Sequence, residues 1–438
     1  MTSLSTAVRP ARERRSISSI SWPVGFALAI PIVFAFYRYW LPNLDNSLQR
    51  FVSDWFPITT VNLCMIWVIM AVGLNVVVGY AGLLDLGYVA FWALGSYMAA
   101  WLMSAQFFQV KFHLGQPSAI TDKAVGIHIS FWLVLVCGAA FCAVWGVIIG
   151  APTLRLRSDY LALVTLGFGE MIPQIFQNGD ETHLNGFNLT NGTKGIGPID
   201  PIGTGVFSNL QGVDPSLGLS GYELPYKFLV FAVIATFCVF VSLRIRRGRL
   251  GRAWLAIRED ELAASMMGVS LVRAKLSAYA VGAVFGGLGG VAYATLVGSV
   301  FPNFSFNFSI TILLMVVLGG MGNVWGVIIG ALVIEWINET GLKQVGAWYN
   351  GQFNAHVDFP SWNFFIFGVI LVLMMLFRRE GLLPETRTRQ ILREPARTEL
   401  ESVGSDIEAG ETDIDVEIDE TPDELVSTEA SGPDGGKP

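Results

Sequence analysis

The sequence predicts an all-α fold, a polytopic transmembrane helical bundle of about 10 helices. Hydrophobic residues make up 53% of the 438-residue chain and charged residues only 14%, whereas a typical soluble domain has about 25% charged residues. Apolar runs recur along the chain, and most approach the ~20 residues that a helix needs to cross a bilayer. Basic residues gather in a few short segments between these runs, which is typical of membrane proteins with a fixed orientation.

Ten apolar runs are the expected helices. In chain order they are 22–37, 58–80, 86–103, 128–150, 160–176, 228–243, 276–297, 308–319, 324–337 and 362–377. The runs 308–319 and 324–337 are short, so they form either one broken helix or two shallow ones. The first run follows several arginines, as in a signal peptide, and residues 27–29 resemble a cleavage site. Because apolar residues continue beyond that point, we expect a retained helix.

Charge divides the chain into three parts: a cytoplasmic segment 1–21, a transmembrane permease domain 22–378 and a cytoplasmic acidic tail 379–438. From Glu401 onward the tail has 13 acidic residues and one lysine. The preceding residues carry 27 basic and 22 acidic side chains, although the net charge of the whole chain is -7. A tail without aromatic residues and rich in Glu, Asp, Gly and Ser is expected to be disordered.

The distribution of arginine predicts the topology. Ten crossings that start in the cytoplasm put the main basic segments on one side: the N-terminal arginines, Arg155 and Arg157, the central loop 244–275, and Arg378 and Arg379. This arrangement obeys the positive-inside rule. The large loop 178–226 then lies outside, and its Gly, Asn and Pro residues predict irregular turns.

The central loop 244–275 is the longest polar interruption between the apolar halves. Its middle is expected to form a short helix, in which Leu255, Leu262 and Met266 share one stripe while Trp254 and Ile257 fall outside it. Small residues beside charged ones are typical of a helix that packs closely against another protein. A solvated helix that only fixes the topology is the alternative.

Three polar residues within the apolar runs or beside them are candidates for function, because ionisable and polar groups at membrane depth are costly. These are Asn75, Asp85 and Glu170. A structural carboxylate near a helix end is the favoured interpretation of Asp85, whereas both interpretations stay open for Glu170. Glu335 is expected near the outer surface, where it needs no special explanation.

Several chemistries are excluded by missing motifs. The sequence contains no GxxxxGK[ST] phosphate loop, no nucleophile elbow and no HExxH. The four cysteines lie in apolar runs without CxxC spacing, and the four histidines form no cluster. We therefore expect no enzymatic site, no metal site and no cofactor in this chain, and movement of a solute across the membrane is the function that remains.

Five stretches resemble one permease family in the right order. They are 73–100, 154–172, 251–276 (GRAWLAIREDELAASMMGVSLVRAKL), 316–326 (VVLGGMGNVWG) and 379–387. Together they are similar to the LivM-like permease subunit of branched-chain amino acid ABC importers, in the hydrophobic amino acid uptake family. The resemblance covers roughly residues 58–387. The first 20 residues, the loop 107–125 and the acidic tail depart from the family.

The resemblance implies a fold of the ABC importer permease type and a set of partners. Two separate ABC ATPase subunits, which bind ATP and Mg, would grip the central loop from the cytoplasm. A second homologous permease subunit would complete the pathway, and an extracytoplasmic binding protein would deliver branched-chain (hydrophobic) amino acids. The location implied is the bacterial plasma (inner) membrane, with both termini cytoplasmic and no nucleic acid involved.

The same resemblance implies roles for residues of this sequence. Candidates for ATPase coupling are Arg252, Arg258, Glu259, Asp260, Glu261 and Ala263, with Gly268 ending the helix. The resemblance does not select residues that line the pathway; Asn75, Asp85, Glu170 and Asn323 are guesses for the pathway or its gating.

Two alternatives remain at this point. Permeases of urea and related amide importers have similar motifs, so the class would be the same and the substrate different. A stand-alone secondary transporter also lacks a phosphate loop. The coupling-type loop and the scarcity of charges at membrane depth argue against it, because ion-coupled carriers usually need several such charges.

Overall fold

The structure is a computed structural model, and it describes residues 18–114, 125–153, 158–180, 188–202, 224–353, 358–378 and 381–383. All of them belong to one compact unit, Met1–Glu385. Two predicted parts lie outside the described residues. They are the segment 1–17 and the acidic tail 379–438, except for residues 381–383.

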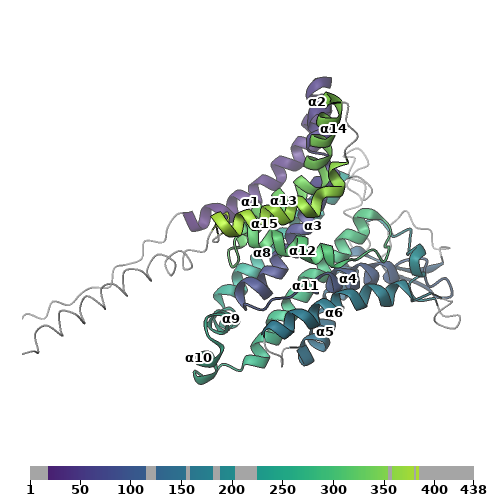
Figure 1. Cartoon of the computed structure of the whole chain (residues 1–438). Coiled ribbons are helices and arrows are strands. Elements are labelled where there is room, and N and C mark those ends of the chain that lie inside the picture. Colours follow the sequence, from purple (N-terminus) through teal and green to yellow (C-terminus); the bar gives the residue numbers. More distant parts are fainter. Residues whose placement is uncertain are drawn as a thin grey trace, which may run out of the picture. The chain divides into compact units, whose positions relative to one another are not determined.

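The predicted helical bundle is confirmed, because each of the ten apolar runs coincides with a helix (Figure 1). The helices are α1 (Ser18–Ala35), α3 (Ile58–Leu74), α4 (Val89–Leu102), α5 (Phe131–Thr153), α6 (Ser158–Gln177), α8 (Leu224–Arg247), α11 (Leu271–Val297), α12 (Phe306–Gly319), α13 (Val324–Trp336) and α15 (Asn363–Phe377). Within the described residues, six helical stretches are long and apolar enough to cross a membrane. The two short runs are separate helices, α12 and α13.

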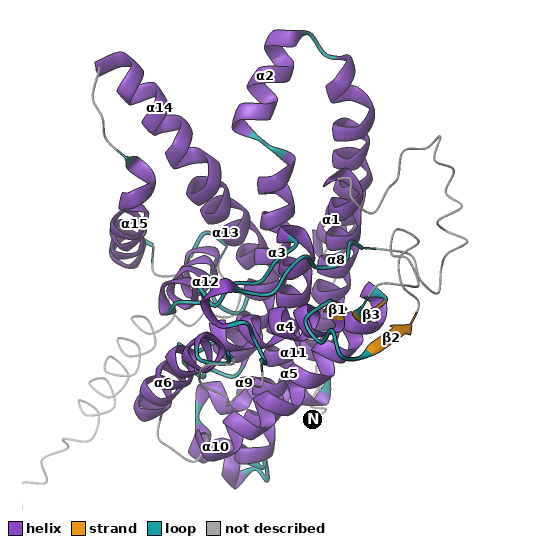
Figure 2. Cartoon of the chain, turned by 90° about the vertical axis from the view of Figure 1, so that its right-hand side faces the viewer, coloured by secondary structure: helices purple, strands orange, loops and turns teal. Residues whose placement is uncertain are grey.

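Some elements were not predicted. Helix α2 (Asn46–Trp55) precedes α3, and α13 continues through a π-helical turn, η7 (Ile337–Gly341), into α14 (Leu342–Phe353). Three short strands, β1 (Met103–Ser104), β2 (Lys111–Leu114) and β3 (Gly126–Ile129), form a sheet in the order β1-β3-β2. Figure 2 shows them together at one side of the helices. The run predicted to begin at residue 128 therefore starts with a strand, and its helix begins at Phe131.

The segment 188–202, part of the large loop 178–226, is attached to this sheet. His128 Nδ1 on β3 lies 2.8 Å from Asp200 Oδ2, and both side chains are buried. Burial raises the pKa of Asp200 to about 6, although its hydrogen bond with His128 acts in the opposite direction. The Asp200 backbone N–H donates to Met103 O at 2.8 Å, which adds a second attachment.

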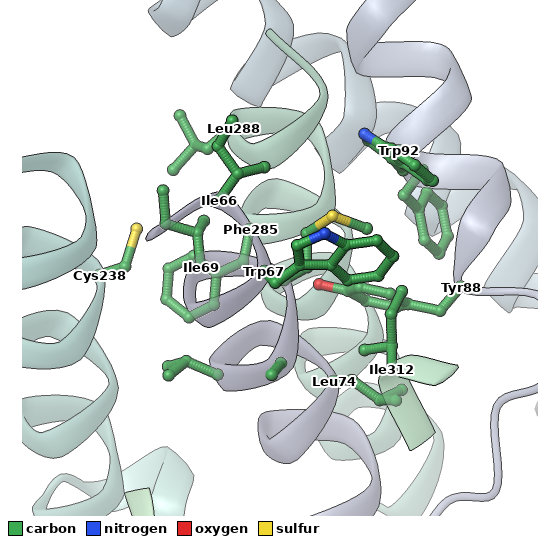
Figure 3. Close-up of a cluster of buried hydrophobic side chains, with 14 of the residues drawn as sticks. Ile66, Trp67, Ile69, Leu74, Tyr88, Trp92, Cys238, Phe285, Leu288 and Ile312 are labelled. Atoms are coloured by element: carbon green, nitrogen blue, oxygen red, sulfur yellow. The ribbon is translucent and has the colours of Figure 1, made fainter. Parts of the chain in front are cut away.

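Helix α3 lies at the centre of the core. Its sequence is apolar on every side, and such a helix is stable only when neighbours surround it. It packs against α8, α11, α12 and α13, and the ring of Trp67 lies 5.5 Å from that of Trp92 on α4. Figure 3 shows Trp67 and Leu74 of α3 among Tyr88, Phe285 and Ile312. A π-helical turn, η3 (Asn75–Tyr80), extends the helix, and all six of its residues are buried.

Helix α11 packs closely on its neighbours because of its glycines. A Cβ added to Gly286 would lie 2.8 Å from Phe91 Cβ of α4, and one added to Gly287 would lie 2.6 Å from Cys142 Sγ of α5. Small residues let membrane helices approach each other at the level of the backbone. Ser96 of α4 uses this proximity to donate a hydrogen bond to Gly290 O at 3.1 Å.

Candidate functional site: the coupling segment and the helix break

The central loop, residues 244–275, is called the coupling segment here. It forms two helices, α9 (Arg249–Glu259) and α10 (Glu261–Met266), at the lower end of the described helices in Figure 1. Helix α9 is held by Trp254, which is fully buried and donates from Nε1 to Ala274 O at 2.9 Å. Ile257 is buried beside it. Trp254 and Ile257, which lie outside the predicted apolar stripe, therefore anchor the coupling segment.

Asp260 separates the two helices, so the expectation of a single helix with one apolar stripe is wrong. Its extended backbone (φ -156, ψ 113) ends α9, and its carboxylate accepts hydrogen bonds from Leu262 N at 2.7 Å and Ala263 N at 3.0 Å. This is the N-cap geometry that satisfies the free N–H groups of a helix start. Glu261 forms an ion pair with Lys275 Nζ at 2.6 Å.

Helix α10 presents large apolar side chains to the outside. Leu262, Met266 and Met267 are 68%, 78% and 85% exposed. Glu259 and Ala263 are exposed as well. The stripe residues Leu262 and Met266 thus point away from the rest of the described protein. We name Leu262, Met266 and Met267 the α10 knob.

The two arginine candidates differ in their contacts. Arg252 is exposed and donates to Arg247 O at 3.2 Å, within the same segment. Arg258 is half-buried, and its Nη1 donates to Gly79 O at 2.5 Å, in the π-helical turn below α3. Gly268 follows α10 with a φ of +82, a conformation that favours glycine.

The break between α12 and α13, residues 320–323, brings two other candidates together. Gly322 N donates to Asn75 Oδ1 at 2.9 Å. Asn323 accepts from Trp325 N at 3.1 Å, which caps α13, and it donates from Nδ2 to Leu383 O at 3.0 Å. Arg258 bonds to Gly79 in η3, and Asn75, the first residue of the same turn, bonds to Gly322, so η3 connects the coupling segment with the helix break.

Asp85 lies in the irregular connection 81–88 and is 1% exposed. Its Oδ1 accepts from Gly87 N at 2.9 Å. Nearby, Thr165 Oγ1 accepts from Leu86 N at 3.1 Å, and Ser309 Oγ accepts from Val89 N at 3.0 Å. These bonds satisfy backbone groups that regular structure leaves unpaired, as irregular backbone at membrane depth requires. Asp85 itself makes one of these bonds, and its Oδ2 is buried without a hydrogen-bond partner among the described residues, so its structural interpretation stays a prediction.

The hydrogen bond of Glu170 is to Phe306 and not to another pathway candidate. Glu170 is exposed on α6, and its Oε1 accepts from Phe306 N at 3.0 Å, at the start of α12. The bond places a negative group at a helix N-terminus, where the helix dipole favours it.

Sequence reasoning overlooked one buried carboxylate. Glu335 was expected near the outer surface without special surroundings, but it is 1% exposed in α13, with Trp67 and Asn338 among its neighbours. No signal in the sequence identifies this burial, because the neighbours that cover Glu335 include a residue from the distant helix α3.

Comparison with known proteins agrees with this architecture. The family described as branched-chain amino acid transport system / permease component matches residues 56–375. The high-affinity branched-chain amino acid transport system permease protein LivM of Escherichia coli is 35% identical over 351 residues, 76% of this chain and 71% of that protein. The chain belongs to this permease family.

Other relatives are permease proteins named LivM and LivH. The LivM transport permease protein of Methanocaldococcus jannaschii is 24% identical over 353 residues, 75% of this chain and 94% of that protein. The LivH permease protein of Salmonella typhimurium is 23% identical over 276 residues, 63% of this chain and 81% of that protein. No solved structure matches the permease. The range 56–375 contains both the coupling segment and the helix break.

Proposed function

We propose that this permease is the membrane subunit of an ATP-driven importer of branched-chain amino acids, and that the coupling segment is where ATPase subunits dock. The observation that carries the docking assignment is the α10 knob, three large apolar side chains that are at least 68% exposed. They stand on a short helix whose base is fixed by Trp254 and by the Glu261–Lys275 ion pair. A firmly held apolar projection is suited to transmit force from a partner.

The remaining parts of the proposal concern partners and orientation. Two ATPase subunits supply the ATP and Mg sites, and a second homologous permease completes the pathway. An extracytoplasmic binding protein delivers the substrate to the outer loops. The positive-inside rule supports a bacterial inner-membrane protein with the coupling segment and both termini in the cytoplasm.

The hydrogen bonds between the two parts of the site suggest how movement could pass between them. Displacement of α9 by a docked ATPase would shift Arg258 and therefore the backbone of η3 at Gly79. Asn75 joins that turn to Gly322 in the helix break. ATP binding would then favour one of two arrangements of α12 and α13, as a ligand with different affinity for two states does.

Recovery of partners tests the docking assignment. The tagged permease is purified in mild detergent from its native host, and the proteins that accompany it are identified by mass spectrometry. Two ATPases and a second permease are expected. Replacing Leu262 and Met266 by serine removes apolar contacts worth about 1.5–3 kcal/mol each, so ATPase recovery should fall at least tenfold.

The matched control is Leu48→Ser, which changes an exposed leucine on α2. It should leave ATPase recovery unchanged. Full ATPase recovery with the doubly substituted permease would refute docking at the α10 knob. If no ATPase accompanies the native permease in several detergents, the protein is a stand-alone transporter. Binding of urea or an amide, and not leucine, by the accompanying binding protein would establish the other importer class.

A further inference from the structure

One buried histidine of the β-sheet faces an acceptor with each of its two ring nitrogens. His128 Nδ1 on β3 lies 2.8 Å from Asp200 Oδ2, and its Nε2 lies 3.3 Å from Val125 O. His128 and Asp200 are only 5% and 7% exposed. Water therefore has little access to this contact, and a hydrogen bond that is missing there is costly.

The two hydrogen bonds of His128 need two protons. A backbone carbonyl group can only accept, so the bond to Val125 O requires a proton on Nε2. The bond to Asp200 requires a second proton, on Nδ1 or on the carboxyl group. A neutral histidine and an ionised aspartate have one proton for the two bonds, so one bond is lost and two acceptors face each other. The complete contact therefore holds one additional proton.

A second histidine lies against the first, although the two are distant from any other histidine in the sequence. The pairing of β2 with β3 places His113 beside His128, and the two rings stack with their centroids 5.4 Å apart and their planes at 21° (Figure 2 shows the two strands). His113 Nε2 is buried without a hydrogen-bond partner among the described residues. The stack therefore tolerates a positive charge on His128 better than on both rings, because like charges repel at short range.

The other charged side chains around this contact are few. Among the described residues, β1, β3 and the start of α5 contribute none besides His128, and Lys111 of β2 and Lys194 of the loop are exposed to water. The charged groups that act on Asp200 are His128 and His113. No described carboxylate besides Asp200 is therefore placed to take over the additional proton.

The carboxyl group of Asp200 favours the same proton count. Burial raises its pKa to about 6, above the usual value of about 3.9. A group whose pKa is raised in the folded protein stabilises it while the proton is bound, and this contribution disappears as the pH rises past about 6. The geometry of His128 and the burial of Asp200 thus have the same sign: both make the contact stronger in mild acid.

We propose that His128, Asp200 and the carbonyl group of Val125 form a proton-dependent contact that fastens the large loop 178–226 to the β-sheet. The contact is complete in mildly acidic surroundings and loses one hydrogen bond in alkaline ones, because histidine is the side chain that ordinarily changes charge between pH 5 and 8. The bond from Asp200 N to Met103 O does not titrate, so the loop is loosened and not released.

The proposed orientation decides which pH matters. With the coupling segment in the cytoplasm, the sheet and the loop 178–226 lie outside it. The hold of the loop on the sheet then follows the external pH. The contact itself depends neither on this orientation nor on the transported solute, so its test is independent of the proposed function.

Hydrogen exchange of the full-length permease in detergent, measured by mass spectrometry at pH 6 and pH 8, tests the contact. Labelling times are scaled to the intrinsic exchange rate at each pH, so that the remaining difference reports on structure. Because a buried hydrogen bond is lost, peptides covering residues 126–129 and 196–202 should exchange roughly fivefold faster or more at pH 8. Peptides of α3 should exchange equally at both pH values. Equal exchange of the first two peptides at both pH values would refute the proposal.

Two substitutions separate the additional proton from the packing of the side chains. Asp200→Asn supplies its own N–H to Nδ1 of a neutral histidine, so both bonds form without the additional proton, and exchange should be slow at pH 8 as well as at pH 6. His128→Asn does not titrate and should remove the pH dependence. Fast exchange of Asp200→Asn at pH 8 alone, or a pH dependence that persists in His128→Asn, would contradict the proton count.

His113→Phe is the matched control for the stacked ring. Phenylalanine keeps an aromatic ring against His128 but cannot bind a proton, so the difference between pH 6 and pH 8 should remain. If this substitution abolishes the difference, His113 is the titrating group and the assignment to His128 is wrong.

Discussion

Asn75 connects two segments of the permease that are 247 residues apart in the sequence. Its side chain is fully buried, and its Oδ1 supplies the acceptor for Gly322 N in the helix break. The same contact requires a glycine at position 79, because a Cβ added to Gly79 would lie 2.7 Å from Gly322 N. One amide side chain therefore fixes the position of the break against α3.

Asn75→Ala should destabilise the permease. The substitution leaves Gly322 N–H buried without an acceptor, which costs about 1–3 kcal/mol. We expect a lower midpoint in thermal unfolding of the detergent-solubilised protein, followed by size-exclusion chromatography. Asn46→Ala, at an exposed position in α2, is the matched control and should leave the midpoint unchanged. Equal midpoints for the native protein and Asn75→Ala would show that the hydrogen bond contributes nothing to stability.

At the scale of the element, α10 is a helix of six residues that depends on its cap and its ion pair. Isolated helices of this length are unstable in water, because nucleation costs more than a few hydrogen bonds return. The presentation of the α10 knob therefore depends on Asp260 and on Glu261. Of the coupling candidates, these two stabilise the segment itself, whereas Glu259 and Ala263 are exposed and available to a partner.

Asp260→Ala should unfold α10 locally, because loss of an N-cap costs about 1 kcal/mol. Hydrogen exchange measured by mass spectrometry should become faster for residues 261–267 and stay unchanged in α11. Asp260→Asn keeps the acceptor for Leu262 N and Ala263 N and should preserve slow exchange. Glu259→Ala should also preserve it, which separates docking from folding. Unchanged exchange in Asp260→Ala would show that packing alone holds the helix.

At the scale of the whole molecule, the permease connects the coupling segment and the helix break through one π-helical turn, η3. Arg258 approaches this turn from α9, and Asn75 within it reaches the break. The glycine-mediated packing of α11 on α4 and α5 leaves little room for independent movement there. Movement between the two parts of the site is therefore expected to pass through η3.

Arg258→Ala should uncouple ATP hydrolysis from uptake. A hydrogen bond from a charged donor contributes about 1.5–3 kcal/mol, so uptake per ATP hydrolysed should fall roughly tenfold or more in proteoliposomes. Recovery of the ATPases should be retained, since Arg258 is directed at Gly79 and not outward. Arg50→Ala changes an exposed arginine on α2, outside the coupling segment, and should leave the ratio unchanged. If both variants transport normally, Arg258 has no part in coupling.

The sequence by itself determined the membrane helices and the position of the coupling segment. Apolar length and arginine clusters are local properties, and the bilayer imposes them on each segment separately. The end of α9 was also available locally, because an aspartate directly before a helical stretch is a typical N-cap. Asp260 is such a residue, and it divides the segment into α9 and α10 where a single helix was expected.

Only the tertiary structure decided which side chains face outward and which segments meet. Trp254 is buried and Leu262 exposed because α9 rests on α11 while α10 projects beyond it, and both residues are apolar in the sequence. The meeting of Asn75 with Gly322 and the burial of Glu335 depend on contacts between distant helices. Hydrophobicity fixes which segments enter the bilayer, but inside it every helix is apolar. Glycine contacts and long-range hydrogen bonds therefore decide which helices pack against each other.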